Sequence, residues 1–204
     1  MKLLMNLRIK KAAIKVLRKK LGWGKLIKVL PGLSKRQKLG EPWKGLAEPI
    51  DQKDKDSRAL IGEAILLYRE LLNMLTSEEA EQIIREVIIE SAVMQLYSLI
   101  PKISKDQIMA MTPDARREKF CGIVEQFPNA DWVMKKASED EFEYSITRCR
   151  LVELIIEVGH PELADAFCMG DGIYFDRHQP DILLTRDTKI GSNDDTCNFN
   201  FKIK

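Results

Sequence analysis

The chain has 204 residues, of which 45% are hydrophobic and 31% are charged, as is ordinary for a folded globular protein. This composition excludes a fibrous, collagenous or disordered chain, and no apolar run approaches the roughly 18 to 20 residues of a membrane-spanning helix. The net charge of +2 hides an asymmetry: residues 1–45 hold 14 bases and one acid, Glu41, while residues 46–204 hold 19 bases and 30 acids. A segment of charge +13 thus precedes a body of charge −11. We expect a basic arm over residues 1–55 and a domain over residues 56–204.

The first 21 residues contain no Gly or Pro and predict a helix. Bases fill the gaps between its apolar residues, which suits a helix docked on the protein or on a second copy in a homo-oligomer. A helix lying on an anionic membrane surface would use the same residue types. Nucleic-acid binding is the weakest interpretation, because no recognisable binding motif accompanies the bases. The apolar residues expected on one side of this helix are Leu3, Leu7, Ile14, Leu17 and Leu21.

Residues 22–55 are rich in helix breakers, among them Gly22, Gly24 and the Pro31-Gly32 pair. This density predicts a linker or an irregular arm. Trp23 and Trp43 lie within it, and aromatic residues in a linker indicate that it packs against the protein.

Three helices follow in chain order. Residues 57–75 carry apolar side chains at spacings of three and four, and residues 77–99 are apolar around much of the circumference, which is typical of a central core helix. Thr76-Ser77 caps the second of these helices. Thr112-Pro113-Asp114 is typical of the start of a third helix, which we expect to end near Phe127.

The second half has the pattern of short strands. Phe199, Phe201 and Ile203 alternate with polar residues, as in a strand with one buried face. Helices are expected at about 148–158 and 161–167, with Gly159 and Pro161 between them. The predicted fold class is α+β, with a helical first half and then a small antiparallel sheet with an inserted helical hairpin. The expected strands are residues 132–137, 142–146, 182–188 and 197–203.

The four cysteines are candidates for chemistry. The gaps between Cys121, Cys149, Cys168 and Cys197 match no compact disulfide framework, and a chain of this size can bury a core without disulfides. The bases from Arg8 onward interrupt any signal-peptide apolar region. We therefore expect reduced thiols and a cytoplasmic protein.

Cys149 is expected at a strand-to-helix transition, between Arg148 and Arg150. A helix N-terminus and two guanidinium groups would both favour the thiolate, the form that attacks electrophiles or binds metals. The alternative is a small core residue on an amphipathic helix.

Cys168-Met169-Gly170-Asp171-Gly172 predicts a glycine-flanked turn, which could bring a thiol and a carboxylate to one pocket or be a plain turn. A Cys-His pair with His160 or His178 remains open, although neither spacing nor context selects it. The cysteines of the last third could bind a metal, but the chain has no C-x-x-C pair.

These segments resemble the L-2-amino-thiazoline-4-carboxylic acid hydrolase family over roughly residues 55–204. The resemblance depends on several short segments in a fixed order. They are residues 147–150 (Thr-Arg-Cys-Arg), Pro161-Glu162-Leu163, Cys168-x-x-Asp171, Pro180-Asp181-Ile182, residues 184–191 and Cys197-x-Phe199.

The resemblance implies hydrolysis of a 2-aminothiazoline ring to N-carbamoyl-cysteine. Such a reaction requires a nucleophile or general base, a proton donor for the leaving sulfur and a cation for the substrate carboxylate. From residue chemistry at the matched positions, we expect Cys149 as nucleophile or metal ligand and Asp171 as general acid/base. Arg148 or Arg186 would bind the carboxylate, with Cys168 and Cys197 as additional or metal-binding candidates.

The chain departs from the family at its end. The family usually has Cys-Asp-Phe followed by a base, whereas this chain has Cys197-Asn198-Phe199-Asn200. If the missing acid carries a proton, the chain has another substrate or no activity. The alternative function is a non-catalytic module that senses a small molecule or a metal and whose basic arm contacts a partner or a membrane.

Overall fold

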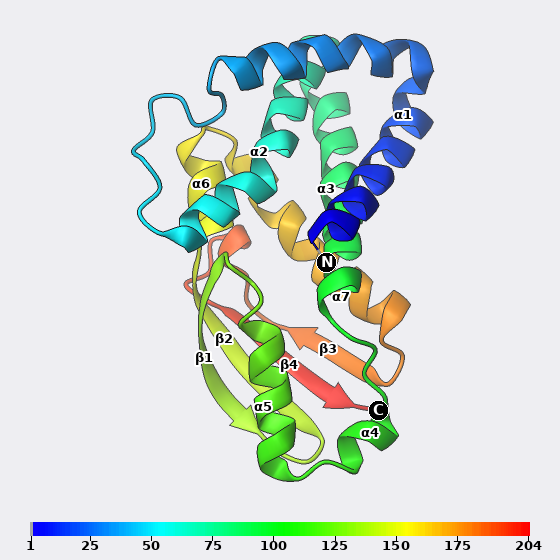
Figure 1. Cartoon of the computed structure of the whole chain (residues 1–204), viewed down its shortest axis with the longest axis vertical. Coiled ribbons are helices and arrows are strands. Elements are labelled where there is room, and N and C mark those ends of the chain that lie inside the picture. Colours follow the sequence, from blue (N-terminus) through cyan, green and yellow to red (C-terminus); the bar gives the residue numbers. More distant parts are fainter. Residues whose placement is uncertain (1) are drawn as a thin grey trace.

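The computed structural model describes residues 2–204, from which seven α-helices, two 3-10 turns and a four-stranded sheet are built. The helices α1, α2 and α3 form one half of the molecule, and the sheet with α4 and α5 forms the other (Figure 1). The helices α6 and α7 connect β2 to β3. The α+β fold class, with its helical first half and inserted helical hairpin, is therefore confirmed.

The first helix, α1 (Lys2–Lys38), corrects the prediction of an irregular segment from residue 22. The helix continues through this segment with a kink at Gly22, whose φ of 69° and ψ of 170° are not helical, and Pro31 lies inside it. The positive φ suits glycine, which has no Cβ. Gly22 therefore bends this helix, and neither Gly22 nor Pro31 ends it, because the apolar side chains beyond the kink pack on the core. The irregular part is residues 39–51.

Only the last part of the row of side chains expected to be apolar on this helix docks on the protein. Val16 and Leu17 are buried, whereas Leu3, Leu7 and Ile14 are exposed. Beyond the kink, Leu26 and Val29 are buried against the same core. Docking on the protein is thus correct for α1 as an element, but of the predicted row only Leu17 and Leu21 pack on the core.

The next two helices are found as predicted, with the bounds of the second matching and the first shifted from 57–75 to 52–72. The helix α2 (Gln52–Leu72) begins at Asp51, whose side chain accepts a hydrogen bond from the Asp54 amide. The helix α3 (Ser77–Leu99) begins with a capping box between Thr76 and Glu79. Two short helices follow, α4 (Lys105–Met109), which was not predicted, and α5 (Pro113–Val124), which begins at Thr112.

The sheet has the strand order β1-β2-β4-β3, and all neighbouring strands are antiparallel. The last strand in sequence therefore lies inside the sheet, between β2 and β3. The face that carries Phe142 and Phe201 packs towards the helices as part of a buried cluster. The strands are β1 (Ala130–Ala137), β2 (Glu141–Cys149), β3 (Ile182–Arg186) and β4 (Cys197–Ile203).

The connection from β2 to β3 corrects a second prediction. After α6 (Arg150–Glu157) and the 3-10 turn Pro161–Leu163, helix α7 runs from Ala164 to His178 without interruption. The segment Gly170-Asp171-Gly172, predicted as a turn, lies in the middle of this helix. Gly170 allows close packing, because a Cβ there would lie 2.6 Å from the Cβ of Ala92 on α3.

Two hydrophobic clusters meet along α3 and α7. One cluster joins α1, α2, the first part of α3 and α6, and the other joins the end of α3, α5 and the inner face of the sheet. No helix in the described part of the chain is long and apolar enough to cross a membrane.

Candidate functional site

A cavity lies where the two hydrophobic clusters meet. Its volume is about 130 Å³, several times the roughly 10 to 15 Å³ that one water molecule needs on the same measure. Side chains from α2, α3, α5, α6, α7 and the sheet line it, and most of them are aliphatic or aromatic. The polar and sulfur-bearing members include Gln95, Asn129, Tyr144, Cys149, Cys168, Asp171, Arg186 and Cys197.

The strand register builds the sheet wall of this cavity. Tyr144 of β2 pairs with Phe199 of β4, and Phe199 pairs with Arg186 of β3, so the three side chains lie in one row across the sheet. The rings of Tyr144 and Phe199 are stacked with centroids 4.9 Å apart. Cys197, two residues before Phe199, points to the same face because side chains alternate along a strand.

Helix α7 supplies the opposite wall. Cys168, Asp171 and Phe175 are spaced three and four residues apart and all line the cavity, since residues at this spacing share one face of a helix. The predicted proximity of the thiol and the carboxylate is therefore found, but a helix and not a turn produces it.

Asp171 and Arg186 form a largely buried ion pair across the two walls, with 9% of the Arg186 side chain and 25% of the Asp171 side chain exposed. Arg186 Nη1 donates to Asp171 Oδ2 at 2.7 Å, and Nη2 donates to the carbonyl oxygen of Cys168. The guanidinium carbon lies 4.9 Å from the centroid of the Phe199 ring, within the range of a cation–π contact. Burial raises the pKa of Asp171, and Arg186 opposes this rise. The wall thus pairs one positive group with one negative group.

The thiols of Cys168 and Cys197 are neighbours. A hydrogen bond from the Cys168 thiol lowers the pKa of Cys197 and correspondingly raises that of Cys168. The amide of Ile190 donates to Cys197 Sγ at 3.2 Å and favours the same thiolate. Both cysteines are free. Of the cavity thiols, Cys197 is the one whose surroundings favour the anion that attacks electrophiles.

Cys149 also lines the cavity, but its surroundings correct the expected thiolate. It is the last residue of β2 and the residue before α6. Hydrogen bonds from the first amides of α6 and from Asn129 favour the thiolate, yet burial outweighs them and raises the pKa of Cys149. The flanking guanidinium groups do not compensate, because both are engaged with carboxylates elsewhere.

Arg148 lies outside the cavity, which corrects its expected contact with a substrate. Its guanidinium donates two hydrogen bonds to Glu153, at 2.7 and 2.8 Å, on the exposed surface. Arg148 and Cys149 are adjacent in a strand, so their side chains point to opposite faces. Arg186 is therefore the cation that the fold offers to a ligand in the cavity.

The other candidates do not join the site. Neither His160 nor His178 is among the described residues that line the cavity. His160 contacts Arg69 and Glu162, and His178 packs against Tyr97. Within residues 2–204, no three His, Cys, Asp or Glu side chains come close enough to hold a metal ion. The described residues therefore form no such cluster for the metal that the sequence left as a possibility.

The departure from the family ending lies on the far face of β4. Ser145 donates to Asn198 Oδ1 at 2.6 Å, and Asn200 donates to Glu141 and Glu143. Neither asparagine lines the cavity, because both alternate with the inward-facing Cys197 and Phe199. The family's acid at position 198 and base at position 200 would therefore change the outer surface of the sheet and leave the cavity wall intact.

Sequence reasoning missed Tyr144, Phe199 and Asn129 as parts of the site. Asn129 Nδ2 lies 3.8 Å from Cys149 Sγ, and the two aromatic rings form the wall below Arg186. The alternation of the last strand already indicated that Phe199 faces inward. Asn129 gave no sequence signal, since it lies in a loop.

Taken together, the fold and the site define an α+β domain with an apolar cavity that carries free thiols and one ion pair. The family model for L-2-amino-thiazoline-4-carboxylic acid hydrolase matches residues 54–201, so the chain belongs to this family. The match supports a hydrolase-like function and covers every residue of the cavity wall named above. It begins after α1.

The other comparisons add little. No curated protein matches the sequence. One solved structure, a double variant of Tt H-NOX, is 16% identical to this chain, with 97% of this chain and 94% of that one covered and a TM-score of 0.33. A likeness this weak supports no functional argument.

Proposed function

We propose that the chain is a hydrolase that opens a small sulfur- and nitrogen-containing ring bound in the cavity, of the 2-aminothiazoline-4-carboxylate type or a related cyclic amidine. The observation that supports this proposal most strongly is that Cys197, Cys168, Asp171 and Arg186 line a single cavity. They come from β4, α7 and β3, and all lie within the family match.

In the proposed reaction, one water molecule is consumed and the ring C–S bond is broken. The Cys197 thiolate adds to the ring carbon between sulfur and nitrogen, and the C–S bond breaks as the leaving sulfur takes a proton. Water then attacks the same carbon, releases the Cys197 thiol and leaves the urea group of N-carbamoyl-cysteine. Splitting one difficult displacement into two easier ones is the usual advantage of a covalent nucleophile.

Asp171 is the proposed proton carrier. Its pKa is raised by burial, which favours the protonated form and suits a group that gives a proton to sulfur and later accepts one from water. Arg186 holds this carboxyl in place through Nη1 and leaves Nε as a donor without a hydrogen-bond partner among the described residues. The substrate carboxylate would bind there.

The experiment is to incubate the purified full chain with 2-aminothiazoline-4-carboxylate and to measure the appearance of product by chromatography. Cys197→Ser and Asp171→Asn should each reduce kcat by about 100-fold or more. Cys121→Ser is the matched control: this thiol lies on α5 and does not line the cavity, so activity should remain. Full activity in both Cys197→Ser and Asp171→Asn would refute the assignment, and Cys149→Ser tests the other buried thiol.

The apolar lining favours a second candidate, a non-catalytic module that holds a small molecule. Of the described residues around the cavity, most carry only carbon in their side chains, a lining better matched to an apolar ligand than to a zwitterion. Fluorescence titration with 1-anilinonaphthalene-8-sulfonate would test this candidate. Binding that Phe199→Ala abolishes, together with no turnover of the aminothiazoline, would favour the module over the enzyme.

A further inference from the structure

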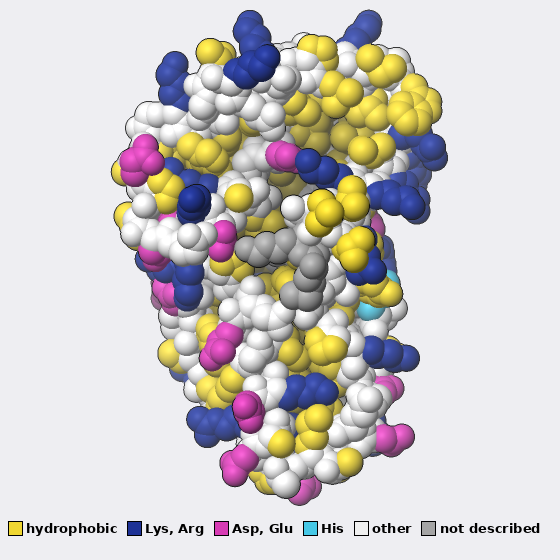
Figure 2. All heavy atoms as spheres, viewed as in Figure 1, with side chains coloured by type: hydrophobic (Ala, Val, Ile, Leu, Met, Phe, Trp, Pro, Cys, Tyr) yellow, Lys and Arg dark blue, Asp and Glu magenta, His cyan; other side chains and the backbone are white. Residues whose placement is uncertain are grey.

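The exposed side of α1 carries an apolar row that the described chain leaves largely uncovered, although the guanidinium carbon of Arg18 lies 5.8 Å from the centroid of the Trp23 ring. Beyond the kink, Trp23, Ile27 and Leu30 are 58%, 61% and 55% exposed. Their spacing of four and three residues places them on one face of the helix. Before the kink, Leu3, Leu7 and Ile14 form a similar exposed row. Figure 2 shows hydrophobic side chains gathered over the upper part of the molecule, where α1 lies.

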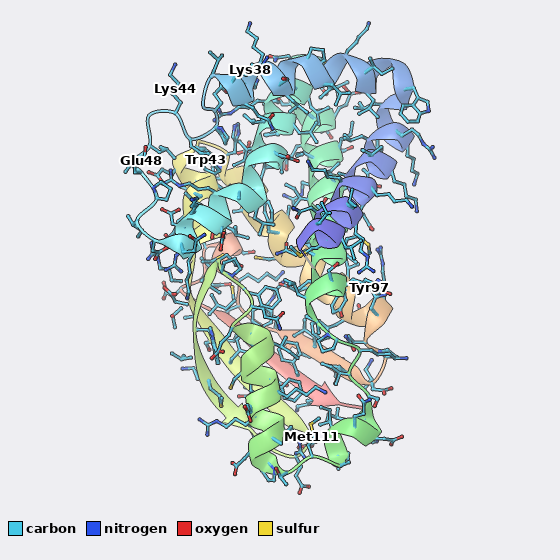
Figure 3. The ribbon with its side chains drawn as sticks, viewed as in Figure 1. Lys38, Trp43, Lys44, Glu48, Tyr97 and Met111 are labelled. Atoms are coloured by element: carbon cyan, nitrogen blue, oxygen red, sulfur yellow. The ribbon has the colours of Figure 1, made fainter. Side chains whose placement is uncertain are left out.

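Bases flank this row. Lys28, Lys35 and Lys38 are exposed beyond the kink, and none of the three has a carboxylate within ion-pair distance in the described chain. In Figure 2 the Lys and Arg side chains stand along the outer edges of the same region. Lys38 and Lys44 extend away from the body at the end of this arm (Figure 3). The face thus combines exposed apolar side chains with lysines that have no ion-pair partner in the described chain.

The two halves of α1 bury a different face against the core. Val16, Leu17, Leu26 and Val29 are buried, so α1 is anchored through one side while it presents the exposed row on another. The surface is therefore preorganised and does not require the helix to detach.

We propose that this face of α1 binds the surface of a bilayer that contains anionic lipids. Trp23, Ile27 and Leu30 would enter the boundary between headgroups and acyl chains, and the flanking lysines would contact lipid phosphates. The proposal is independent of the proposed hydrolysis, because the cavity wall residues lie on other elements.

Charge favours a membrane over a second copy of the chain as the occupant. A symmetric dimer through this face would bring two basic surfaces together, and like charges across an interface oppose association. An anionic lipid surface attracts each lysine instead, by about a 5-fold gain in affinity per base near the surface. With an uncharged apolar partner the lysines would add no affinity, so their presence favours an anionic surface.

The test uses the full chain and vesicles of phosphatidylcholine, either alone or mixed with phosphatidylserine. We expect sedimentation with the mixed vesicles only, weakened by added salt because the charge term is screened. The combined change Trp23→Ser, Ile27→Ser, Leu30→Ser should reduce binding by at least about 10-fold. The combined change Lys28→Glu, Lys35→Glu should do the same.

The matched control is an equal loss of exposed apolar groups elsewhere. Val133, Ile156 and Leu183 are also exposed but lie on β1, α6 and β3. Their combined change to Ser should leave vesicle binding unchanged. Circular dichroism of each variant would show that it is folded, so that lost binding reports on the surface itself.

A spectroscopic readout locates the contact. Trp23 is exposed, while Trp43 and Trp132 are partly buried, so tryptophan emission should move to shorter wavelength on vesicle binding, and Trp23→Phe should remove the shift. No binding to mixed vesicles would overturn the proposal. So would light scattering that shows a dimer which the serine variant converts to a monomer, because a second copy would then be the occupant.

Discussion

At the scale of single residues, Arg186 links the two walls of the cavity. Its guanidinium donates hydrogen bonds to the Asp171 carboxylate and to the carbonyl oxygen of Cys168, and it lies over the ring of Phe199. The Arg186 side chain is only 9% exposed, so its charge is stabilised mainly by these partners and not by water. Removing one member of a buried pair costs more than the pair contributes, because the other charge is left without compensation.

We therefore expect Arg186→Met to lower the free energy of unfolding by about 2 to 4 kcal/mol at pH 8. The pKa of Asp171 is raised by burial in the folded state, and without Arg186 it would rise further. A raised folded pKa gives stability that is present at acid pH and lost as pH rises. The loss should thus be smaller at pH 4 than at pH 8, as urea denaturation at both values would show.

Arg186→Lys is the comparison variant, since it keeps the charge but loses the forked geometry. The free energy of unfolding of Arg186→Lys should lie between those of the wild type and Arg186→Met. An equal loss for Arg186→Met at both pH values would contradict a role of Arg186 in holding the Asp171 charge.

At the scale of elements, the packing of α7 on α3 positions one wall of the site. Gly170 lies at the contact, where a Cβ would meet the Cβ of Ala92 at 2.6 Å, while at Gly172 a Cβ would meet no atom within 4 Å. Both glycines are inside the same helix. Comparing an alanine substitution at each position therefore separates the helix propensity of glycine from the effect of close packing between α7 and α3.

Gly170→Ala should destabilise the fold by about 1 to 3 kcal/mol, because overpacking forces α7 away from α3. Gly172→Ala should instead stabilise it by up to about 1 kcal/mol through helix propensity. Thermal unfolding followed by circular dichroism at 222 nm, the helical band, measures both. Similar effects of the two substitutions would contradict the close contact.

At the scale of the whole molecule, α1 is part of the core although the family match begins after it. Leu26 is 6% exposed and its neighbour Ile27 is 61% exposed. Substituting each of these two residues therefore tests whether α1 contributes to the stability of the fold. Leu26→Ala should cost about 2 to 4 kcal/mol of unfolding free energy, and Ile27→Ala less than about 0.5 kcal/mol.

Urea denaturation of both variants measures their free energies of unfolding and shows whether α1 stabilises the domain. A small effect of Leu26→Ala would mean that the arm is a separate appendage, in which case residues 1–55 would be a unit of their own as the charge asymmetry suggests. The buried contacts of Val16, Leu17 and Val29 lead us to expect the larger effect.

An ion cluster joins the two halves of the molecule. Asp131 of β1 binds Lys53 of α2 and Arg150 of α6, each at 3.0 Å. Hydrogen bonds from Arg150 and then Lys53 lower the pKa of Asp131 to about 2. A lowered carboxylate pKa gives stability that is present above the ordinary pKa and is lost as pH falls through the folded value.

Asp131→Asn should therefore lower the free energy of unfolding by about 1 kcal/mol at pH 7, a modest value because the carboxylate is partly exposed and screened. The difference from the wild type should disappear as pH falls towards 2. Glu139→Gln, at an exposed carboxylate without an ion pair in the described chain, is the control and should have no effect. Urea midpoints across this pH range measure both.

The sequence by itself determined the elements whose signals are local. Thr76 and Thr112 marked helix starts through their caps, and the alternation around Phe199 marked a strand with one buried face. The α+β class followed from the order of these patterns. Cys149, Cys168, Asp171, Arg186 and Cys197 were identified by their chemistry and by resemblance, and all five line the cavity.

Only the tertiary structure decided what depends on distant contacts. The residues after Gly22 form a helix because Leu26 and Val29 pack on the core, and Gly170-Asp171-Gly172 stays helical because α7 packs closely on α3. The strand order brought Cys197 and Arg186 to one wall, while burial raised the pKa of Cys149 and left Arg148 outside. Local sequence carries propensity and spacing, but burial and pairing come from residues far apart in the chain, and these selected the chemistry of the site.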